Sequence, residues 1–199
     1  MSDASNGSLA EDFDPARGVF VAMHQRPANL ADVEMRSLSA AQRALLVIDG
    51  TVTQFLQAYF LEPVIVERLQ QQQDDATAFD AQWLQCAPGE PLLRRSVLLK
   101  GVRSGRLFAW ADSTILPGRL SAEMRRGLVD EPGGLGKIII DSGLETRREG
   151  LWFGLEQVES RELPENIAES RWLSRSYRIF AGGQPLMRVT ERFPCVTPD

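Results

Sequence analysis

Two similar hairpin segments, Leu92–Pro117 and Trp172–Pro194, constrain the fold more than any other feature of the sequence. Each segment begins with a Leu-x-Arg-Ser motif, turns at a glycine-containing loop, and returns along an apolar strand that ends in proline. A duplicated hairpin of this kind predicts a pseudo-symmetric antiparallel sheet at the centre of the molecule.

The rest of the chain supplies further strands and several helices. Strands are predicted over Val64–Gln70, Pro91–Leu99, Leu107–Leu116, Gly150–Val158, Trp172–Phe180 and Pro185–Phe193. Helices are predicted over Ala40–Ile48, Thr51–Phe60, Ser121–Leu128 and a segment from Gly134 to Gly143. The polar run Gln70–Ala76 is interpreted as a loop. Helices segregated from antiparallel hairpins predict an α+β fold, in which the helices pack around the sheet.

A capping-box pattern from Ser39 to Gln42 marks the beginning of the first predicted helix. Asp49-Gly50 interrupts that helix before Thr51 resumes helical spacing. Such a break can expose backbone amides at the N-terminus of the second helix, where anions are favoured. A plain corner between two helices is the alternative, and it is the more common structure.

The 199-residue chain has the length of one domain with a polar N-terminal stretch. We expect residues 1–37 to form a flexible tail, with order beginning between Asp32 and Leu38, and residues 38–199 to form a single domain. No apolar run approaches the roughly 20 residues that a membrane span needs. The N-terminus also lacks the basic start and apolar stretch of a signal peptide.

Charge and cysteine content narrow the expected partners and location. The formal net charge of −5 argues against a nucleic-acid partner. The two cysteines, Cys86 and Cys195, do not form a Cys-x-x-Cys motif. They favour a reducing compartment, the cytoplasm, over a disulfide scaffold.

The scarcity of histidine excludes several classes of chemistry. His24 is the only histidine, and it lies in or near the polar N-terminal stretch. Ser-His-Asp catalysis, Cys-His catalysis and histidine-based zinc sites are therefore not expected. The glycines at Gly133–Gly136 lack the spacing of a dinucleotide fingerprint. An enzyme with this sequence is expected to use carboxylates, arginines and backbone amides, without a metal.

Three charged residues fall on predicted apolar strand faces, because alternate side chains of a strand share one face. Glu191 shares its face with Val189 and Phe193. Arg95 and Arg175 lie on the apolar faces of the strands that begin the two hairpins. Charges of both signs are therefore expected on one side of one sheet.

These inward charges have two interpretations. In the first, Glu191 forms a buried ion pair with Arg95 or Arg175 that fixes the strand register, although an apolar pair is often as stable. In the second, the charges line a polar cavity, where an arginine binds a carboxylate ligand through two parallel hydrogen bonds. A glutamate in an apolar wall is suited to move a proton near neutral pH. The residues alone leave both interpretations open.

Four segments, in their order and spacing, resemble a known family. They are LLVIDGTVTQF (Leu45–Phe55), LLRRSVLL (Leu92–Leu99), LGKIIIDSGLETRRE (Leu135–Glu149) and PLMRVTERF (Pro185–Phe193). Together they resemble chorismate pyruvate-lyase, and more closely its lyase-like branch in actinobacteria and cyanobacteria. The resemblance extends over about Leu38–Val196. It implies an antiparallel sheet with helices around an enclosed ligand, and cleavage of chorismate to 4-hydroxybenzoate and pyruvate without metal or cofactor.

The resemblance also implies site residues. Arg95 matches the family's carboxylate-binding arginine, and Glu191, in the Thr-Glu-x-Phe motif, matches its essential glutamate. Thr51 and Leu135 match positions that contact the substrate through the backbone. Arg175 shares an Arg-Ser context with the family and is a further substrate-binding candidate.

One departure from the family is Ser113, which stands where the family has a second arginine. This difference leaves product release and the exact substrate open. The same fold serves as the effector-binding module of winged-helix transcription regulators, so a non-catalytic sensor of an aromatic carboxylate is the alternative function. For a lyase we expect a monomer or weak homodimer whose product feeds quinone or phenolic-lipid synthesis.

Overall fold

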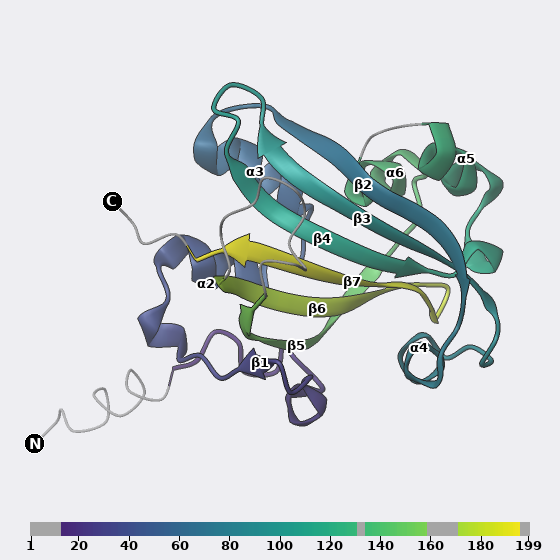
Figure 1. Cartoon of the computed structure of the whole chain (residues 1–199), viewed down its shortest axis with the longest axis horizontal. Coiled ribbons are helices and arrows are strands. Elements are labelled where there is room, and N and C mark those ends of the chain that lie inside the picture. Colours follow the sequence, from purple (N-terminus) through teal and green to yellow (C-terminus); the bar gives the residue numbers. More distant parts are fainter. Residues whose placement is uncertain (1–12, 131–133, 159–170, 196–199) are drawn as a thin grey trace, which may run out of the picture.

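The computed structural model describes residues 13–130, 134–158 and 171–195. Its centre is a seven-stranded antiparallel sheet with the order β1-β5-β6-β7-β4-β3-β2 (Figure 1). The strands are β1 (Leu30–Ala31), β2 (Val64–Asp75), β3 (Pro91–Gly101), β4 (Leu107–Ile115), β5 (Arg147–Gln157), β6 (Arg171–Ala181) and β7 (Gln184–Pro194). With helices packed against this sheet, the predicted α+β fold is confirmed.

The two similar hairpins form the middle of the sheet. β3 pairs with β4 in the first hairpin, and β6 pairs with β7 in the second. The return strands β4 and β7 pair with each other in antiparallel orientation. The duplicated sequence thus produces two hairpins joined side by side, as the pattern predicts.

In the described part of the chain, five α-helices pack against the sheet. They are α2 (Ala40–Val47), α3 (Val52–Phe60), α4 (Ala78–Leu84), α5 (Ala122–Asp130) and α6 (Leu135–Asp141), with short 3-10 turns at Met23–Gln25, Met35–Ser37 and Pro117–Arg119. Leu46 and Leu56, from α2 and α3, share one apolar cluster with Val97 of the sheet. Ile139 of α6 shares a second cluster with Ile179, on the same sheet face. Two apolar clusters therefore cover different parts of one face.

The corner between α2 and α3 forms as its sequence predicts. Ser39 Oγ accepts from the Gln42 amide at 3.2 Å, and the Ser39 amide donates to Gln42 Oε1 at 2.9 Å, which completes the capping box. The helix ends at Val47, and the next one begins after Thr51 as its N-cap residue. The interruption at Asp49-Gly50 thus separates two helices.

The loop predicted at Gln70–Ala76 is wrong, because β2 continues as a strand to Asp75. Residues on both sides of a bulge near Leu69 pair with β3, including Gln71 with Arg95. β2 is one of the two edge strands of the sheet. Most of its side chains face solvent, so its sequence is polar. The helix α4, capped by a reciprocal Thr77–Asp80 box, was also not predicted.

Part of the predicted tail, within residues 13–37, packs against the sheet, while residues 1–12 lie outside the described residues. Leu30 and Ala31 form β1 and pair with β5, and Ala22 and Leu30 are buried. A glycine on β5 permits this contact, since a Cβ atom on Gly154 would lie 2.5 Å from the Ala31 carbonyl oxygen. The segment therefore belongs to the packed sheet edge.

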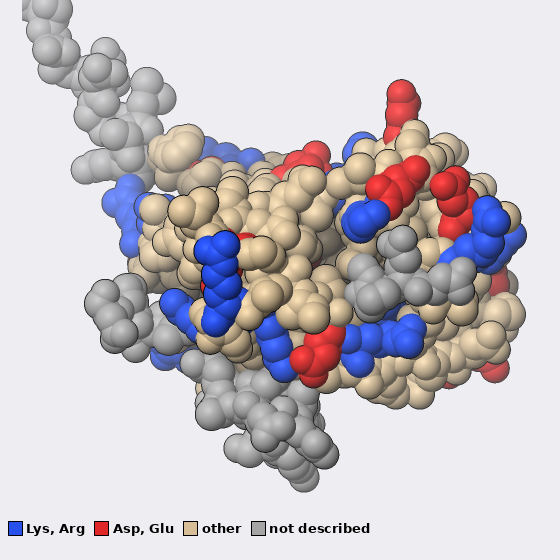
Figure 2. All heavy atoms as spheres, turned by 90° about the horizontal axis from the view of Figure 1, so that it is seen from above, with Lys and Arg blue, Asp and Glu red and all other residues tan. Residues whose placement is uncertain are grey.

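The surface seen from above the view of Figure 1 carries charges of both signs (Figure 2). On the right of that view, basic and acidic side chains lie beside one another. None of the described helices has the length and apolar character that a membrane span requires.

Candidate active site

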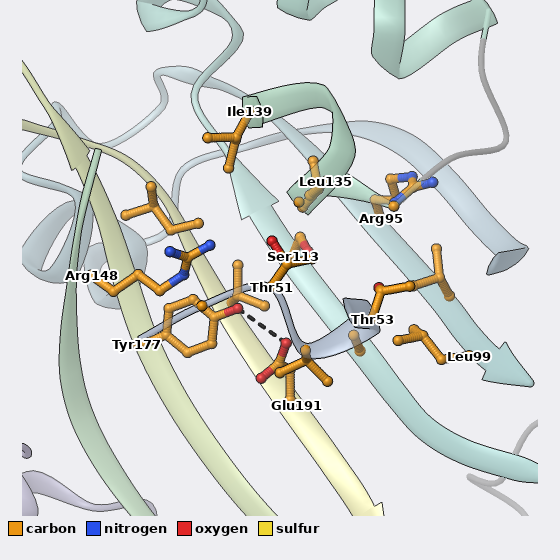
Figure 3. Close-up of a pocket in the computed structure, with 18 residues that line it drawn as sticks. Thr51, Thr53, Arg95, Leu99, Ser113, Leu135, Ile139, Arg148, Tyr177 and Glu191 are labelled. Carbon is orange, nitrogen blue, oxygen red and sulfur yellow. Dashed lines mark hydrogen bonds between the residues drawn. The ribbon is translucent and has the colours of Figure 1, made fainter. Parts of the chain in front are cut away.

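A polar cavity lies between the two apolar clusters, on the sheet face covered by α3 and α6 (Figure 3). It is narrow, about 60 Å³ in volume. It shares Thr51, Thr53 and Gly134 with an outer groove of about 560 Å³ between α3, α6 and β2. Its lining residues are Gly50, Thr51, Val52, Thr53, Arg95, Val97, Leu99, Ala111, Ser113, Gly134, Leu135, Gly136, Ile139, Arg148, Tyr177, Ile179, Val189 and Glu191.

Strand register explains why residues distant in sequence meet at this cavity. Arg95 on β3 lies opposite Ser113 on β4, which lies opposite Val189 on β7. Val189 in turn lies opposite Tyr177 on β6. Directly opposite residues of neighbouring strands share a face, so these four side chains form one row across the cavity floor.

Glu191 lies in the next row, between Ala111 on β4 and Arg175 on β6. Arg175 Nε donates to Glu191 Oε2 at 2.8 Å, and Arg175 Nη2 lies 2.8 Å from the same oxygen. The Tyr177 hydroxyl donates to Glu191 Oε1 at 3.1 Å, the bond drawn in Figure 3. Both carboxylate oxygens are thus fixed in orientation.

Arg175 lies behind Glu191 and is not among the described residues that line the cavity. Its Nη1 donates to the carbonyl oxygens of Leu46 and Ile48, both at 3.0 Å. Sequence reasoning placed Arg175 among the substrate-binding candidates, whereas its contacts in the structure are with Glu191 and the end of α2. Both interpretations of the inward charges hold in part. Arg175 and Glu191 form an ion pair, and the Glu191 carboxylate also lines the cavity.

The Tyr177 hydroxyl is held in its protonated form. Burial raises the pKa of Tyr177, and the neighbouring charge of Glu191 raises it further. The hydroxyl therefore acts as a hydrogen-bond donor to Glu191 at neutral pH. Arg175 supplies the positive charge that pairs with Glu191 in this buried environment.

Arg95 occupies the end of the cavity beside Leu135 (Figure 3). It is only 3% exposed. Burial lowers the pKa of its guanidinium, and the nearby charge of Arg68 lowers it further. Guanidinium groups remain protonated in proteins, so Arg95 is a buried cation. A carboxylate ligand would offset its desolvation through charge-assisted hydrogen bonds.

The N-terminal turns of two helices form the wall opposite the sheet. The turn that begins α3 contributes residues 50–53, and the turn that begins α6 contributes residues 134–136. The two turns touch at a glycine, since a Cβ atom on Gly136 would lie 2.5 Å from Thr51 Cγ2. First-turn amides have no partner within their own helix and attract negative charge. The structure therefore brings the predicted positions Thr51 and Leu135 together at one wall.

Two lining residues, Arg148 and Tyr177, were not predicted as functional residues. Arg148 lies opposite Ile179 on the neighbouring strand, so strand alternation places it on the cavity face. Its guanidinium reaches the cavity from the side of Tyr177, whereas Arg95 lies at the opposite side (Figure 3). Within the described parts of the chain, no group of three or more His, Cys, Asp and Glu side chains is placed to hold a metal ion.

Comparison with known proteins places the chain in a family. Residues 46–197 match the family described as chorismate pyruvate-lyase Rv2949c-like. The chain belongs to this family. A chorismate pyruvate-lyase of Mycobacterium tuberculosis is 32% identical over 176 residues, covering 82% of this chain and 84% of the relative. Its counterpart in Mycobacterium leprae is 32% identical over 171 residues, covering 82% and 79%. The resemblance seen in the four sequence segments is confirmed.

Solved structures share the fold at much lower identity. The effector domain of PhnF from Mycobacterium smegmatis is 14% identical, with a TM-score of 0.58 over 73% of this chain and 89% of that chain. PhnF from the same organism is 13% identical, with a TM-score of 0.60 over 75% of this chain and 65% of that chain. The fold shared with regulator effector domains is thus also confirmed.

Proposed function

We propose that this protein cleaves chorismate to 4-hydroxybenzoate and pyruvate. Family membership supports this activity. The observation that carries it to this chain is the meeting of Arg95 and Glu191 in one cavity, on rows of the sheet that differ by a single step. A buried cation and a fixed carboxylate are the two groups that an acidic substrate with a mobile proton requires.

The reaction depends more on positioning the substrate than on strong chemical activation. Chorismate loses its enolpyruvyl ether group and one ring proton, and the ring becomes aromatic as the C–O bond breaks. The bond electrons leave with enolpyruvate, which takes up a proton to become pyruvate. Because aromatisation drives the elimination, the protein must mainly hold the ring and accept the proton in a dry site.

Arg95 and Glu191 divide these tasks. Arg95 binds the ring carboxylate through two parallel hydrogen bonds. Glu191 faces the hydroxyl and ether oxygens at the other end of the ring and assists proton movement. Arg175 and Tyr177 hold Glu191 from behind, so we assign Arg175 a positioning role in place of substrate binding.

The helix wall supplies further polar contacts. Backbone amides near Thr51 and Leu135 bind the remaining substrate oxygens, favoured by the positive ends of α3 and α6. The cavity is narrow, so substrate access requires these two turns to part, and the outer groove beside them is the approach. Product release by the same movement would be slow.

The decisive experiment is Glu191→Gln, assayed for 4-hydroxybenzoate by absorbance and for pyruvate in parallel. Glutamine keeps the shape and an oxygen acceptor for Arg175 but accepts a proton poorly. We expect turnover to fall by about 10²–10⁴-fold while the protein stays folded in a thermal unfolding measurement. Arg95→Ala should lose both substrate binding and turnover.

Glu67→Gln is the matched control, because Glu67 lies on β2 with its side chain 50% exposed and paired with Lys100. It should leave turnover unchanged. Wild-type turnover by a folded Glu191→Gln protein would contradict the assignment. Tight binding of 4-hydroxybenzoate with no pyruvate formed by the wild-type protein would select the sensor function instead.

Several finer expectations accompany this function. The elimination is proposed to need no cofactor, and the product to enter quinone or phenolic-lipid synthesis. Cys86 and Cys195 are not joined in a disulfide, which supports a cytoplasmic location. The net charge of −5 and the intermixed surface charges (Figure 2) support the absence of a nucleic-acid partner. We expect a monomer or a weak homodimer.

A further inference from the structure

Arg148 is a cation at the cavity for which neither the sequence motifs nor the family match provides a role. It lies near the beginning of β5, next to the α2–α3 corner. Its side chain is 17% exposed, and it lines both the cavity and a second pocket bounded by Phe20 and Asp49. Arg148 therefore stands at a junction between the interior of the site and the outside.

The protein contacts of Arg148 leave donors available. Its Nη1 lies 3.5 Å from the Asp49 carbonyl oxygen and 3.8 Å from Asp49 Oδ1, both at the limit of a useful contact. The Asp49 side chain is 74% exposed, so water competes for it. Arg148 Nε is buried and has no hydrogen-bond partner among the residues that the structure describes. A buried donor of this kind is costly unless something binds it.

The position of Arg148 relative to Glu191 indicates which ligand group could bind its unpaired donor. Tyr177 contacts Glu191 through its hydroxyl and lines the cavity with Arg148. Arg148 on β5 and Arg95 on β3 lie on opposite sides of the cavity (Figure 3). A substrate whose ring carboxylate is bound by Arg95 and whose ether bond faces Glu191 would extend its second carboxylate toward β5.

We propose that Arg148 binds the second carboxylate of the substrate, the one carried by the enolpyruvyl group. This assignment rests on the proposed lyase function. A planar guanidinium with spare donors matches a carboxylate through two parallel bonds. It holds the departing group beside Glu191 and makes the site selective for a dicarboxylate over a monocarboxylate of similar shape.

The aromatic product supplies the test, because 4-hydroxybenzoate retains the ring carboxylate and lacks the second one. Arg148→Gln should raise the KM for chorismate by at least about tenfold. The same variant should change the Kd of 4-hydroxybenzoate, measured by calorimetry, by less than about threefold. Arg148→Lys should recover part of the chorismate affinity, since it restores the charge without the planar fork.

Two control variants separate this role from structural effects. Asp49→Asn removes the ionic partner of Arg148 but leaves the cation, so the KM should stay within about twofold of wild type. Arg147→Gln changes the adjacent arginine, whose side chain is 61% exposed and paired with Glu149. This variant should also leave the KM for chorismate unchanged. If Asp49→Asn reproduces the Arg148→Gln defect, Arg148 serves only to tie the corner together and the proposal is wrong.

The proposal for Arg148 can be tested even if the proposed lyase function is wrong. If the wild-type protein forms no pyruvate, calorimetric titration with chorismate and with 4-hydroxybenzoate still compares dicarboxylate and monocarboxylate binding. Selective loss of chorismate binding in Arg148→Gln then supports the proposal in a sensor. Equal loss of both ligands, or no loss of either, or no chorismate binding by wild type, overturns it.

Discussion

Tyr177 shows how much of the proposed chemistry depends on the orientation of one carboxylate. Its hydroxyl holds Glu191 Oε1 at 3.1 Å, while Arg175 holds the other oxygen. Tyr177→Phe removes one hydrogen bond, worth about 1 kcal/mol, and leaves the ring packing in place. We expect kcat for chorismate to fall by about three- to tenfold, with KM changed less than twofold, in steady-state kinetics.

The second tyrosine of the chain provides the control for this change. Tyr59 lies on α3, is 58% exposed, and is not among the described residues that line the cavity. Tyr59→Phe should leave both kinetic constants unaltered. An unchanged kcat in Tyr177→Phe would mean that Arg175 alone suffices to orient Glu191.

Strand alternation was sufficient to single out two residues of the candidate site. Arg95 and Glu191 stand out because a charge on an otherwise apolar face needs an explanation. Arg148 escaped notice because the strand was predicted to begin at Gly150, so Arg148 lay outside it and was assigned to no face. Tyr177 escaped for a different reason, since an aromatic residue on an apolar face is ordinary in a core.

The contact between α3 and α6 determines the shape of the cavity wall. Gly136 lies against Thr51, and an added Cβ would lie 2.5 Å from Thr51 Cγ2 and 3.2 Å from Oγ1. Gly136→Ala must therefore push the two helix N-termini apart. A displacement of about 1 Å can cost about 10²-fold in rate, so we expect a large loss of kcat/KM with a smaller effect on stability.

Removing the obstructing methyl group tests this cause directly. Thr51→Ser deletes Cγ2 and keeps the backbone contact that the site is proposed to use. The double variant Thr51→Ser with Gly136→Ala should regain much of the lost kcat/KM. Gly118→Ala is the control, because nothing lies within 4 Å of a Cβ atom at that position. Absence of recovery in the double variant would contradict the steric explanation.

The sequence predicted central elements better than edge elements. The hairpins β3–β4 and β6–β7 alternate or run apolar because one of their faces is buried under the helices. β2 could not be followed past Gln70, since an edge strand with solvent on most of its side chains needs no apolar pattern. α4 is short, and only its capping box marks it.

The N-terminal segment is held to the rest of the molecule by close backbone contact. Gly154 on β5 lies against β1, where an added Cβ would lie 2.5 Å from the Ala31 carbonyl oxygen. Gly154→Ala must displace this segment and expose part of the cluster that contains Leu30 and Trp152. We expect a loss of about 1–3 kcal/mol in the free energy of unfolding, measured by urea denaturation.

The comparison variant is again Gly118→Ala, which should change the free energy of unfolding by less than about 0.5 kcal/mol. Unchanged stability in Gly154→Ala would mean that residues 13–37 contribute little to the fold. This segment was not predicted to be ordered, because its polar sequence carries no apolar period. Its contacts depend on glycines located more than 100 residues later in the chain.

The pairing of Arg175 with Glu191 has a consequence for how such a chain can change over generations. Substituting Glu191 alone leaves the Arg175 charge buried with only two carbonyl oxygens, and substituting Arg175 alone leaves a carboxylate without its cation. Each single step is penalised even where the chemistry is no longer under selection. A lineage that abandons catalysis while keeping the fold would therefore have to replace both positions together, and descendants should differ at both or at neither.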